Sequence, residues 1–152
     1  MGRLGYDGDT DESAAGWGFG ISSDGCAKEM IPLPAVFFGL ILAITDGDTV
    51  RVRIPIWPQH YIETSIRIAG IDTPEIHGAC SREKKLAVEA KEALARLLPL
   101  NALVELRHIE IDKYGNRVGA EVRTLANLDV AGHLMKIGLA HSYAGKKKRG
   151  WC

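Results

Sequence analysis

The chain has 152 residues, 25% charged and 46% hydrophobic, which is the composition of a single globular domain with a real core. Its formal net charge of zero does not indicate a nucleic-acid binder. The zero is a cancellation, however. Residues 1–30 carry two basic and six acidic side chains, and residues 31–152 carry 17 basic and 13 acidic ones. The basic body therefore suits a polyanionic ligand better than the total suggests.

The amino-terminal part predicts a flexible leader over residues 1–34, because residues 1–29 hold seven of the 17 glycines, six acids and few aliphatic side chains. An apolar run at residues 31–44 follows and is too short to cross a membrane as a helix. It could be the core of a signal peptide starting at Met30, but no basic region follows that methionine. Cleavage near Ala43 would also remove the strand leading into Asp46, so we favour a buried strand.

Strand patterns begin at residues 35–45 and continue as period-2 alternation over residues 50–56 and 62–68. A helix is predicted over residues 81–98, with Ser81 as its N-cap and Pro99 as its stop. Two further strands are expected at residues 104–108 and 118–123, joined by a hairpin turn at 112–116. Asn127 can cap a last helix that ends at Gly138.

This order, βββαββα, predicts a mainly β fold with some α. Five short strands with a helix between the third and the fourth match an OB-fold barrel with two helices. The domain is predicted at residues 35–145, followed by a basic tail at 146–152. Lysines and an arginine at 146–149 could steer a polyanion, although a solvated charged tail is the plainer interpretation.

Carboxylates gather at the expected strand ends. Asp48 and Asp72 would converge if the barrel forms, and a hard cation such as Ca²⁺ prefers such oxygen ligands. Asp46 lies in the same turn as Asp48 and could bind directly or orient it. The alternative is that residues 46–49 are simply a hairpin turn, a common use of Asp and Gly.

The segment from Asp72 to Glu75 gives a stronger signal. Pro74 restricts the backbone of Thr73, so the directions of the two acids are preset. Glu75 could act as a general base or position a water beside a metal. Thr-Pro-Glu could instead start a helix, but Gly78 favours a loop.

Arg67 lies five residues before Asp72, where its guanidinium could bind a phosphate, although a surface arginine without a role is a common alternative. Arg117 is the candidate for a second phosphate-binding arginine, and Asn116 competes for that place. Lys113, Tyr114 and Tyr143 could add a charge and stacking rings. Among the histidines, His77 lies two residues beyond Glu75.

The three cysteines, Cys26, Cys80 and Cys152, are widely spaced and show no zinc-binding pair. A Cys80–Cys152 disulfide would tie the tail to the segment after Glu75 and would need an oxidising compartment. Two free thiols are the equal alternative.

With these residues in view, the chain resembles the staphylococcal nuclease (thermonuclease) family. The resemblance rests on four ordered segments over residues 36–143, and it looks especially like short bacterial members that end in Trp-Cys. The segments are Asp46-Gly-Asp-Thr-Val50, Arg67 with Gly70-Ile-Asp-Thr-Pro-Glu75, Asp112-Lys-Tyr-Gly115 and Gly138-Leu-Ala140.

The resemblance implies an OB-fold enzyme that uses one Ca²⁺ ion to hydrolyse DNA and RNA, leaving 5′-hydroxyl and 3′-phosphate ends. By matching position, Asp48 and Asp72 would bind the metal with the carbonyl of Thr73, and Asp46 would support them. Glu75 would be the base or water-orienting group. The resemblance further implies phosphate binding by Arg67 and Arg117, and substrate contacts by Lys113, Tyr114 and Tyr143.

The chain departs from that family in three places. Asn116 stands between Tyr-Gly and Arg117, the loop after Glu75 is short, and the chain ends soon after Tyr143. The leading hypothesis is therefore a Ca²⁺-dependent endonuclease acting on single-stranded DNA and RNA, with double-stranded DNA as a further substrate and no membrane partner. The rival is an OB-fold module that binds nucleic acid or protein without cutting. The resemblance slightly favours export, and a cytoplasmic location stays open.

Overall fold

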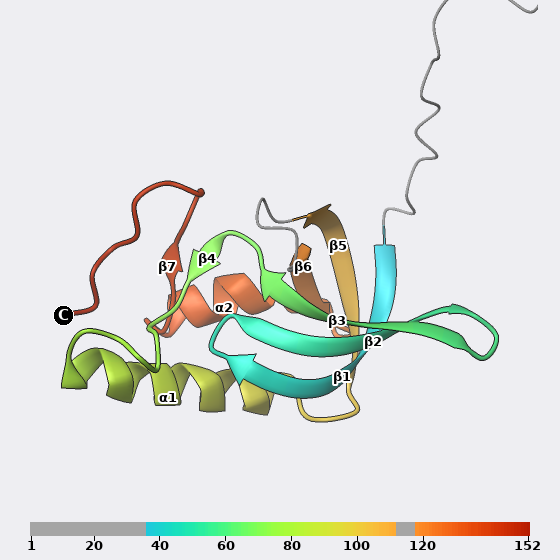
Figure 1. Cartoon of the computed structure of the whole chain (residues 1–152), viewed down its shortest axis with the longest axis horizontal. Coiled ribbons are helices and arrows are strands. Elements are labelled where there is room, and N and C mark those ends of the chain that lie inside the picture. Colours follow the sequence, from blue (N-terminus) through green and yellow to red (C-terminus); the bar gives the residue numbers. More distant parts are fainter. Residues whose placement is uncertain (1–35, 112–117) are drawn as a thin grey trace, which may run out of the picture. The chain divides into compact units, whose positions relative to one another are not determined.

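The computed structural model describes residues 36–111 and 118–152, which belong to one compact unit. Five strands close into a barrel in the order β1-β2-β3-β6-β5 (Figure 1). They are β1 (Val36–Asp46), β2 (Thr49–Trp57), β3 (His60–Ile68), β5 (Leu103–Ile111) and β6 (Val118–Thr124). The predicted OB-fold barrel is confirmed. The predicted leader at residues 1–34 lies outside the described residues, so the domain boundaries stay predictions.

The first three strands form the expected antiparallel meander. In β2 and β3 the buried side chains alternate, with Val50 and Val52 facing Ile66 and Ile68 in the core. The barrel closes through a short parallel pairing of β3 with β6, which the strand patterns alone did not specify. The apolar run after residue 35 is strand β1, as preferred over a signal peptide.

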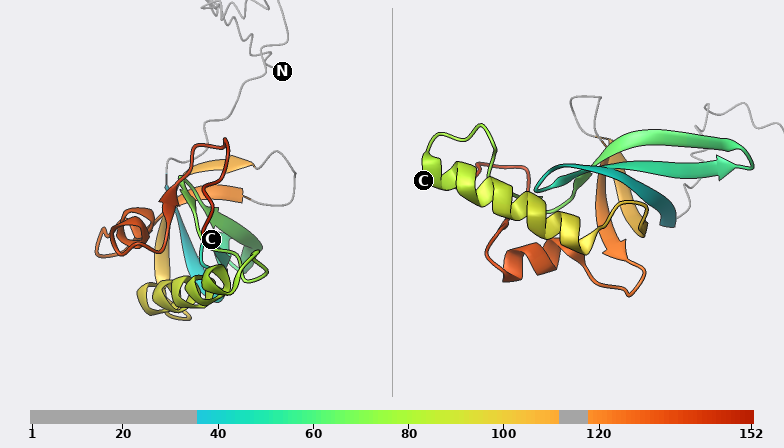
Figure 2. Two further views of the ribbon diagram at one scale, coloured as in Figure 1. Left: turned by 90° about the vertical axis from the view of Figure 1, so that its left-hand side faces the viewer. Right: turned by 90° about the horizontal axis from the view of Figure 1, so that it is seen from below.

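Helix α1 (Ser81–Leu97) packs against β1 and against helix α2 (Val130–Lys136), as the two views in Figure 2 show. It buries small residues, Ala87, Ala90 and Ala93, together with Leu94. Small side chains let the helix approach the barrel closely. Among the described residues, no helix has both the length and the apolar character needed to span a membrane.

Both predicted helix caps are wrong by one or two residues. Ser81 is already helical and Cys80 occupies the cap without a side-chain hydrogen bond. Asn127 adopts a left-handed turn with φ of 63°, which asparagine tolerates. Asp129 caps α2 instead, because its carboxylate accepts a hydrogen bond from the backbone N–H of Gly132.

Two more differences concern strands. Strand β5 extends beyond the predicted residue 108 through a bulge at His108, whose φ is 48°.

A separate two-stranded sheet joins β4 (Ile71–Asp72) to β7 (His141–Ser142). Gly70, with φ of 79°, provides the turn between β3 and β4, and its carbonyl accepts a hydrogen bond from the N–H of Tyr143. The segment after α2 is thereby attached beside Asp72.

Candidate active site

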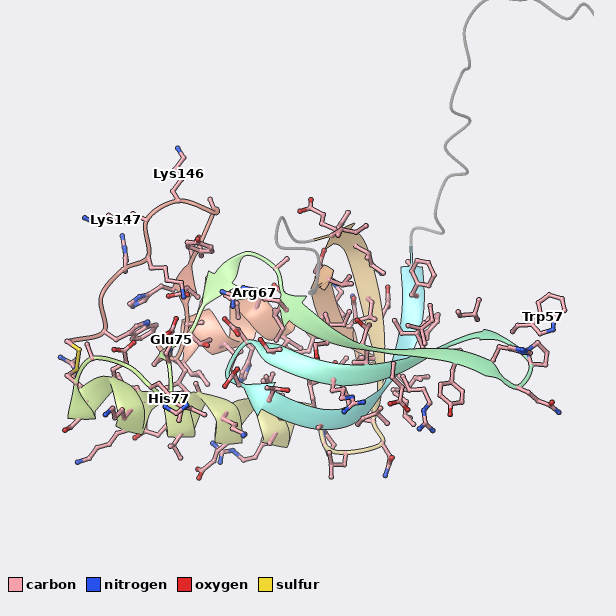
Figure 3. All side chains as sticks on the ribbon, viewed as in Figure 1. Trp57, Arg67, Glu75, His77, Lys146 and Lys147 are labelled. Atoms are coloured by element: carbon pink, nitrogen blue, oxygen red, sulfur yellow. A yellow bond between two sulfur atoms is a disulfide. The ribbon has the colours of Figure 1, made fainter. Side chains whose placement is uncertain are left out.

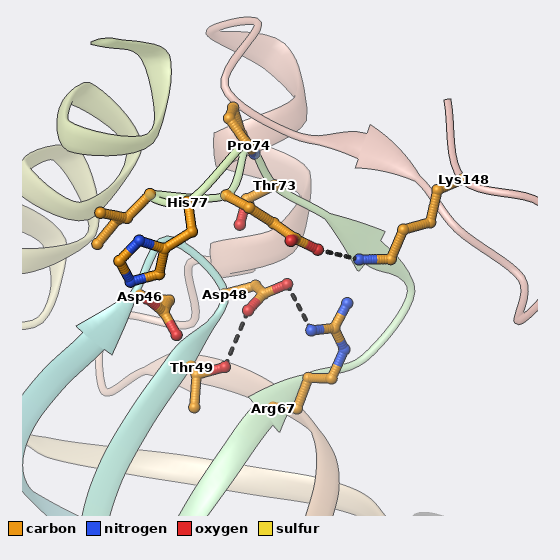
Figure 4. Close-up of a pocket in the computed structure, with 10 residues that line it drawn as sticks. Asp46, Asp48, Thr49, Arg67, Thr73, Pro74, His77 and Lys148 are labelled. Carbon is orange, nitrogen blue, oxygen red and sulfur yellow. Dashed lines mark hydrogen bonds and ion pairs between the residues drawn. The ribbon is translucent and has the colours of Figure 1, made fainter. Parts of the chain in front are cut away.

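A polar pocket of about 280 Å³ lies where the β1–β2 turn, the end of β3 and the loop after β4 meet (Figure 4). Each of these segments contributes residues that the sequence singled out. Its lining consists of Asp46, Asp48, Thr49, Arg67, Thr73, Pro74, Glu75, Ile76, His77 and Lys148. A second hollow adjoins it and shares Thr73, Glu75, His77 and Lys148, while adding Asp72.

Gly47 explains how the β1–β2 turn comes so close to the other segments. A Cβ atom at this position would lie 2.8 Å from Cβ of Ala90 in α1 and 3.0 Å from Oγ1 of Thr73. Only glycine permits this approach without movement. On the other side of the turn, the carbonyl of Asp48 accepts a hydrogen bond from the N–H of Ile68. The turn therefore does more than connect two strands, because Gly47 lies against Thr73 and Ala90 while the next residue, Asp48, is hydrogen-bonded to β3.

Arg67 joins the two predicted metal carboxylates. Its Nη1 lies 2.8 Å from Oδ2 of Asp48 and its Nη2 lies 3.6 Å from Oδ1 of Asp72. The two aspartate side chains are only 7% and 4% exposed. Thr49 donates a hydrogen bond to the other oxygen of Asp48. Residues far apart in the sequence thus meet at one buried place, as the barrel prediction required.

Carboxylates outnumber cations around the two hollows. Burial raises the pKa of Asp48, although Arg67 and the Thr49 hydroxyl oppose the shift, and the nearby charges of Asp72 and Asp46 add to it. Oδ1 of Asp72 is buried and has no hydrogen-bond partner among the described residues. Lys148 approaches this oxygen to 3.1 Å, but without the angles of a hydrogen bond. Such a site favours a further cation.

The donor set suits a hard divalent cation. Asp48 and Asp72 offer carboxylate oxygens, and Thr73 offers a backbone carbonyl oxygen. All three residues are buried. Among the described residues, the group of three His, Cys, Asp or Glu side chains whose donor atoms lie closest together is a different one, Cys80, Glu83 and Cys152. Both sulfur atoms there are joined in a disulfide, so that cluster lacks thiolate ligands. The residues around Asp48 and Asp72 therefore fit the Ca²⁺ that the sequence predicted.

Glu75 lies at the mouth of the pocket, with its side chain 62% exposed. Its carboxylate accepts a 2.6 Å hydrogen bond from Lys148, and this bond together with the lysine charge lowers the pKa of Glu75. The segment after Pro74 is a loop rather than a helix start. Glu83 of α1 holds that loop, because its carboxylate accepts the N–H of Ala79 at 2.9 Å.

The remaining predicted site residues differ in whether the structure places them in the pocket. Asp46 lines the pocket beside Asp48. Tyr143 is half-buried and is not part of the lining, although its backbone is tied to Gly70. Lys113, Tyr114 and Arg117 lie outside the residues that the structure describes.

The structure adds one residue that the sequence did not single out, Lys148. It belonged to a basic run for which solvation was the plainer interpretation. Cys80 and Cys152 are joined in a disulfide, with Cα atoms 6.0 Å apart. This bond attaches the end of the chain next to the loop after Glu75. The disulfide, together with the basic run, was the signal that could have placed Lys148.

The fold and the pocket together define an OB-fold domain with a buried acidic cluster, an arginine and an exposed glutamate at one end of the barrel. A family model described as staphylococcal nuclease homologue matches residues 65–150. A protein of Phaeosphaeria nodorum (strain SN15) named probable endonuclease LCL3 is 30% identical over 141 residues, which covers 87% of this chain. This chain spans only 44% of that relative.

The chain belongs to the staphylococcal nuclease family. This membership confirms the resemblance seen in the sequence, and together with the relative's name it supports a nuclease.

Proposed function

We propose that this protein is a Ca²⁺-dependent, sugar-nonspecific endonuclease that hydrolyses single-stranded DNA and RNA, and also double-stranded DNA. The products would carry 5′-hydroxyl and 3′-phosphate ends. The observation that carries the proposal is the meeting of Arg67 with two buried aspartates beside Glu75. A module that only bound nucleic acid would have no need to bury two carboxylates at one place, since burying charges is costly even when cations lie beside them.

Asp48, Asp72 and the carbonyl of Thr73 would hold the Ca²⁺, and Asp46 would support Asp48 from the same turn. When bound, the ion would supply Lewis-acid stabilisation of charge on a phosphate oxygen. Hard cations and these oxygen ligands suit each other, and a bound cation would stabilise the ionised form of Asp48, whose pKa is raised mainly by burial.

Arg67 would bind the phosphate. Its guanidinium has five N–H donors, so it can keep an aspartate partner and still donate to a phosphate oxygen. A fixed cation at this place stabilises the charge that develops at phosphorus in the transition state. Arg117 would add a second guanidinium, and Lys113, Tyr114 and Tyr143 would contact the substrate.

Glu75 would accept the proton of the attacking water or orient that water. It is ionised at neutral pH, as a proton acceptor must be, while the hydrogen bond from Lys148 lowers its pKa and makes it a weaker base until that lysine changes partner. Its exposure at the pocket mouth leaves it accessible to water. As the water attacks phosphorus, the bond to the 5′-oxygen breaks and that oxygen leaves with a proton from solvent.

The test is cleavage of labelled single-stranded DNA and RNA in Ca²⁺, in EDTA and in Mg²⁺, by wild type and Glu75→Gln. We expect cutting in Ca²⁺, none in EDTA, and a rate lower by about 10²- to 10⁴-fold in the variant. Product 5′ ends should accept phosphate from a polynucleotide kinase without prior dephosphorylation. Folded, Ca²⁺-loaded wild type that binds but never cuts would favour the binding module instead.

A further inference from the structure

The end of the chain is fixed at two points beside the pocket. The indole of Trp151 stacks on the ring of His141, with centroids 3.8 Å apart and planes within 1°, and Trp151 is buried. The next residue, Cys152, is bonded to Cys80 just before α1. The intervening residues 144–150 are exposed. A segment that is fixed near its end by a ring stack and a disulfide has few backbone positions available to it. A side chain in that segment can therefore be held in one place beside the pocket.

Lys148 is the tail residue that reaches the site. Its Nζ lies 2.6 Å from Oε1 of Glu75 and 3.1 Å from Oδ1 of Asp72, and it lines both adjoining hollows (Figure 4). Lys146 and Lys147 are exposed and point away from the pocket (Figure 3). In the part of the chain that the structure describes, neither of them has an ion-pair partner. Three consecutive lysines thus have different surroundings.

The charges around the site indicate what Lys148 contributes. The carboxylates that line the two hollows outnumber the cations by two. The five carboxylates are those of Asp46, Asp48, Asp72, Glu75 and Glu83, and the three cations are Arg67, Lys148 and Arg149. A divalent cation would bring this set to formal neutrality. Without Lys148 the loaded site would keep one negative charge and would repel a phosphodiester, which is itself an anion.

The lysine can also change partners. Its side chain is 47% exposed and its partner Glu75 is 62% exposed, so their ion pair is weak. An ammonium group has three donors on a flexible stem. It can therefore exchange its contact with Glu75 for a phosphate oxygen arriving in the pocket and still lie beside the buried Asp72.

We propose that Lys148 is a phosphate-binding residue of the active site and that the Cys80–Cys152 disulfide positions it there. The proposal rests on the proposed function, because it takes a phosphodiester as the substrate. It assigns the tail a part in substrate binding, with the bonded and stacked residues at its end acting as positioning residues.

The test compares Lys148→Ala with Lys147→Ala, which removes the same charge one residue away. Two readouts are needed: kcat/KM on single-stranded DNA in Ca²⁺, and calorimetric affinity for a nucleoside 3′-phosphate, which cannot be cut. We expect Lys148→Ala to lose about tenfold or more in both, as for a charge-assisted hydrogen bond, and Lys147→Ala to change them less than about twofold. Lys148→Arg should recover most of the loss.

Cys152→Ser tests the positioning role. It should lower kcat/KM and nucleotide affinity about as far as Lys148→Ala, and the double variant should be little worse than either, because both changes remove one effect. A thermal melt shows that each variant is folded at the assay temperature. Additive losses in the double variant would overturn the positioning role.

Unchanged or raised activity in Lys148→Ala would overturn the proposal. The lysine would then have only a structural role, or it would block the pocket. Failure of the proposed function is distinguishable, because wild type itself would not cut. The nucleotide affinity would still test Lys148 in that case.

Discussion

Two arginines on the β2–β3 ladder, Arg67 and Arg53, each pair with a carboxylate, and the two pairs differ in their surroundings. Arg67, opposite Thr49, pairs with Asp48, and these side chains are 24% and 7% exposed. Arg53 pairs with Glu63 directly across the ladder, and these are 42% and 27% exposed. Figure 3 shows Trp57 at the far end of this hairpin, well away from Arg67 and Glu75.

Contact distance does not identify the functional pair, because the Arg53–Glu63 contact is shorter, at 2.6 Å, than the Arg67–Asp48 contact at 2.8 Å. Arg53 also stacks over Tyr61, at 4.4 Å from the ring centre, and Arg51 shares Glu63. These are ordinary surface contacts of small value. What sets Arg67 apart is that it lies between two buried carboxylates, Asp48 and Asp72. Function is therefore indicated by the charge imbalance around a pair and not by the pair itself.

The largest effect should come from removing each arginine in turn. Arg67→Ala should lower kcat/KM about 10³-fold, because it removes a fixed cation from the developing charge at phosphorus. Arg53→Ala should leave the rate within about twofold of wild type. The measurement is initial-rate cleavage of single-stranded DNA in Ca²⁺, with thermal melts to confirm that both variants are folded. Equal losses in the two variants would contradict the distinction between the pairs.

A smaller effect is expected from crowding at the Arg67 end. Gly47→Ala would place a methyl group 2.8 Å from Cβ of Ala90, and relieving that contact should cost about 1–3 kcal/mol of unfolding free energy. Activity should fall as well, since the shift that relieves the contact at Gly47 also displaces the adjacent Asp48.

Gly119→Ala in β6 is the matched control. A Cβ there would meet only the carbonyl oxygen of Glu110, at an ordinary 3.8 Å, so stability and rate should change little. The measurements are urea unfolding and the cleavage rate. The account of the turn would be wrong if Gly47→Ala unfolded and cut like wild type.

The smallest effect is a difference in pH dependence of stability. The pKa of Asp48 is raised, mainly by burial, so its contribution is fully present below the usual aspartate pKa of about 3.9 and is lost as pH rises through the folded value. The pKa of Glu63 is lowered, mainly by the hydrogen bond from Arg53, so its contribution is present above the usual glutamate pKa of about 4.3 and is lost as pH falls.

Unfolding free energies in EDTA would show this contrast. From about pH 3 to pH 7, Asp48→Asn should become progressively more stable relative to wild type, and Glu63→Gln progressively less stable. Differences that run in the same direction for both variants would contradict the assigned environments.

Much of the fold could be predicted because its signals are local. The alternation of Val50 with Val52 and of Ile66 with Ile68 identified the buried face of β2 and β3. The apolar repeat of α1 was equally readable. Asp129 was missed as a cap because Asn127 also has capping chemistry, and only the backbone turn decides between them. The β3–β6 closure depends on contacts distant in sequence, which no local pattern contains.

In the candidate site, too, some residues could be predicted from local patterns and one could not. Asp48, Arg67 and Asp72 stand at predictable strand ends, so the barrel alone brings them together. Lys148 stands in a basic run with no periodicity. Its position depends on the Trp151 stack and on a disulfide that spans 72 residues, neither of which follows from its neighbours.

A calorimetric Ca²⁺ titration of wild type and of Asp72→Asn, with Glu63→Gln as the control, tests the metal site. We expect one ion per chain in wild type and in the control, and no binding or binding weakened by at least about tenfold in Asp72→Asn. Wild type that binds no Ca²⁺, or an Asp72→Asn variant that binds it like wild type, would contradict the assignment of the buried aspartates as the metal site.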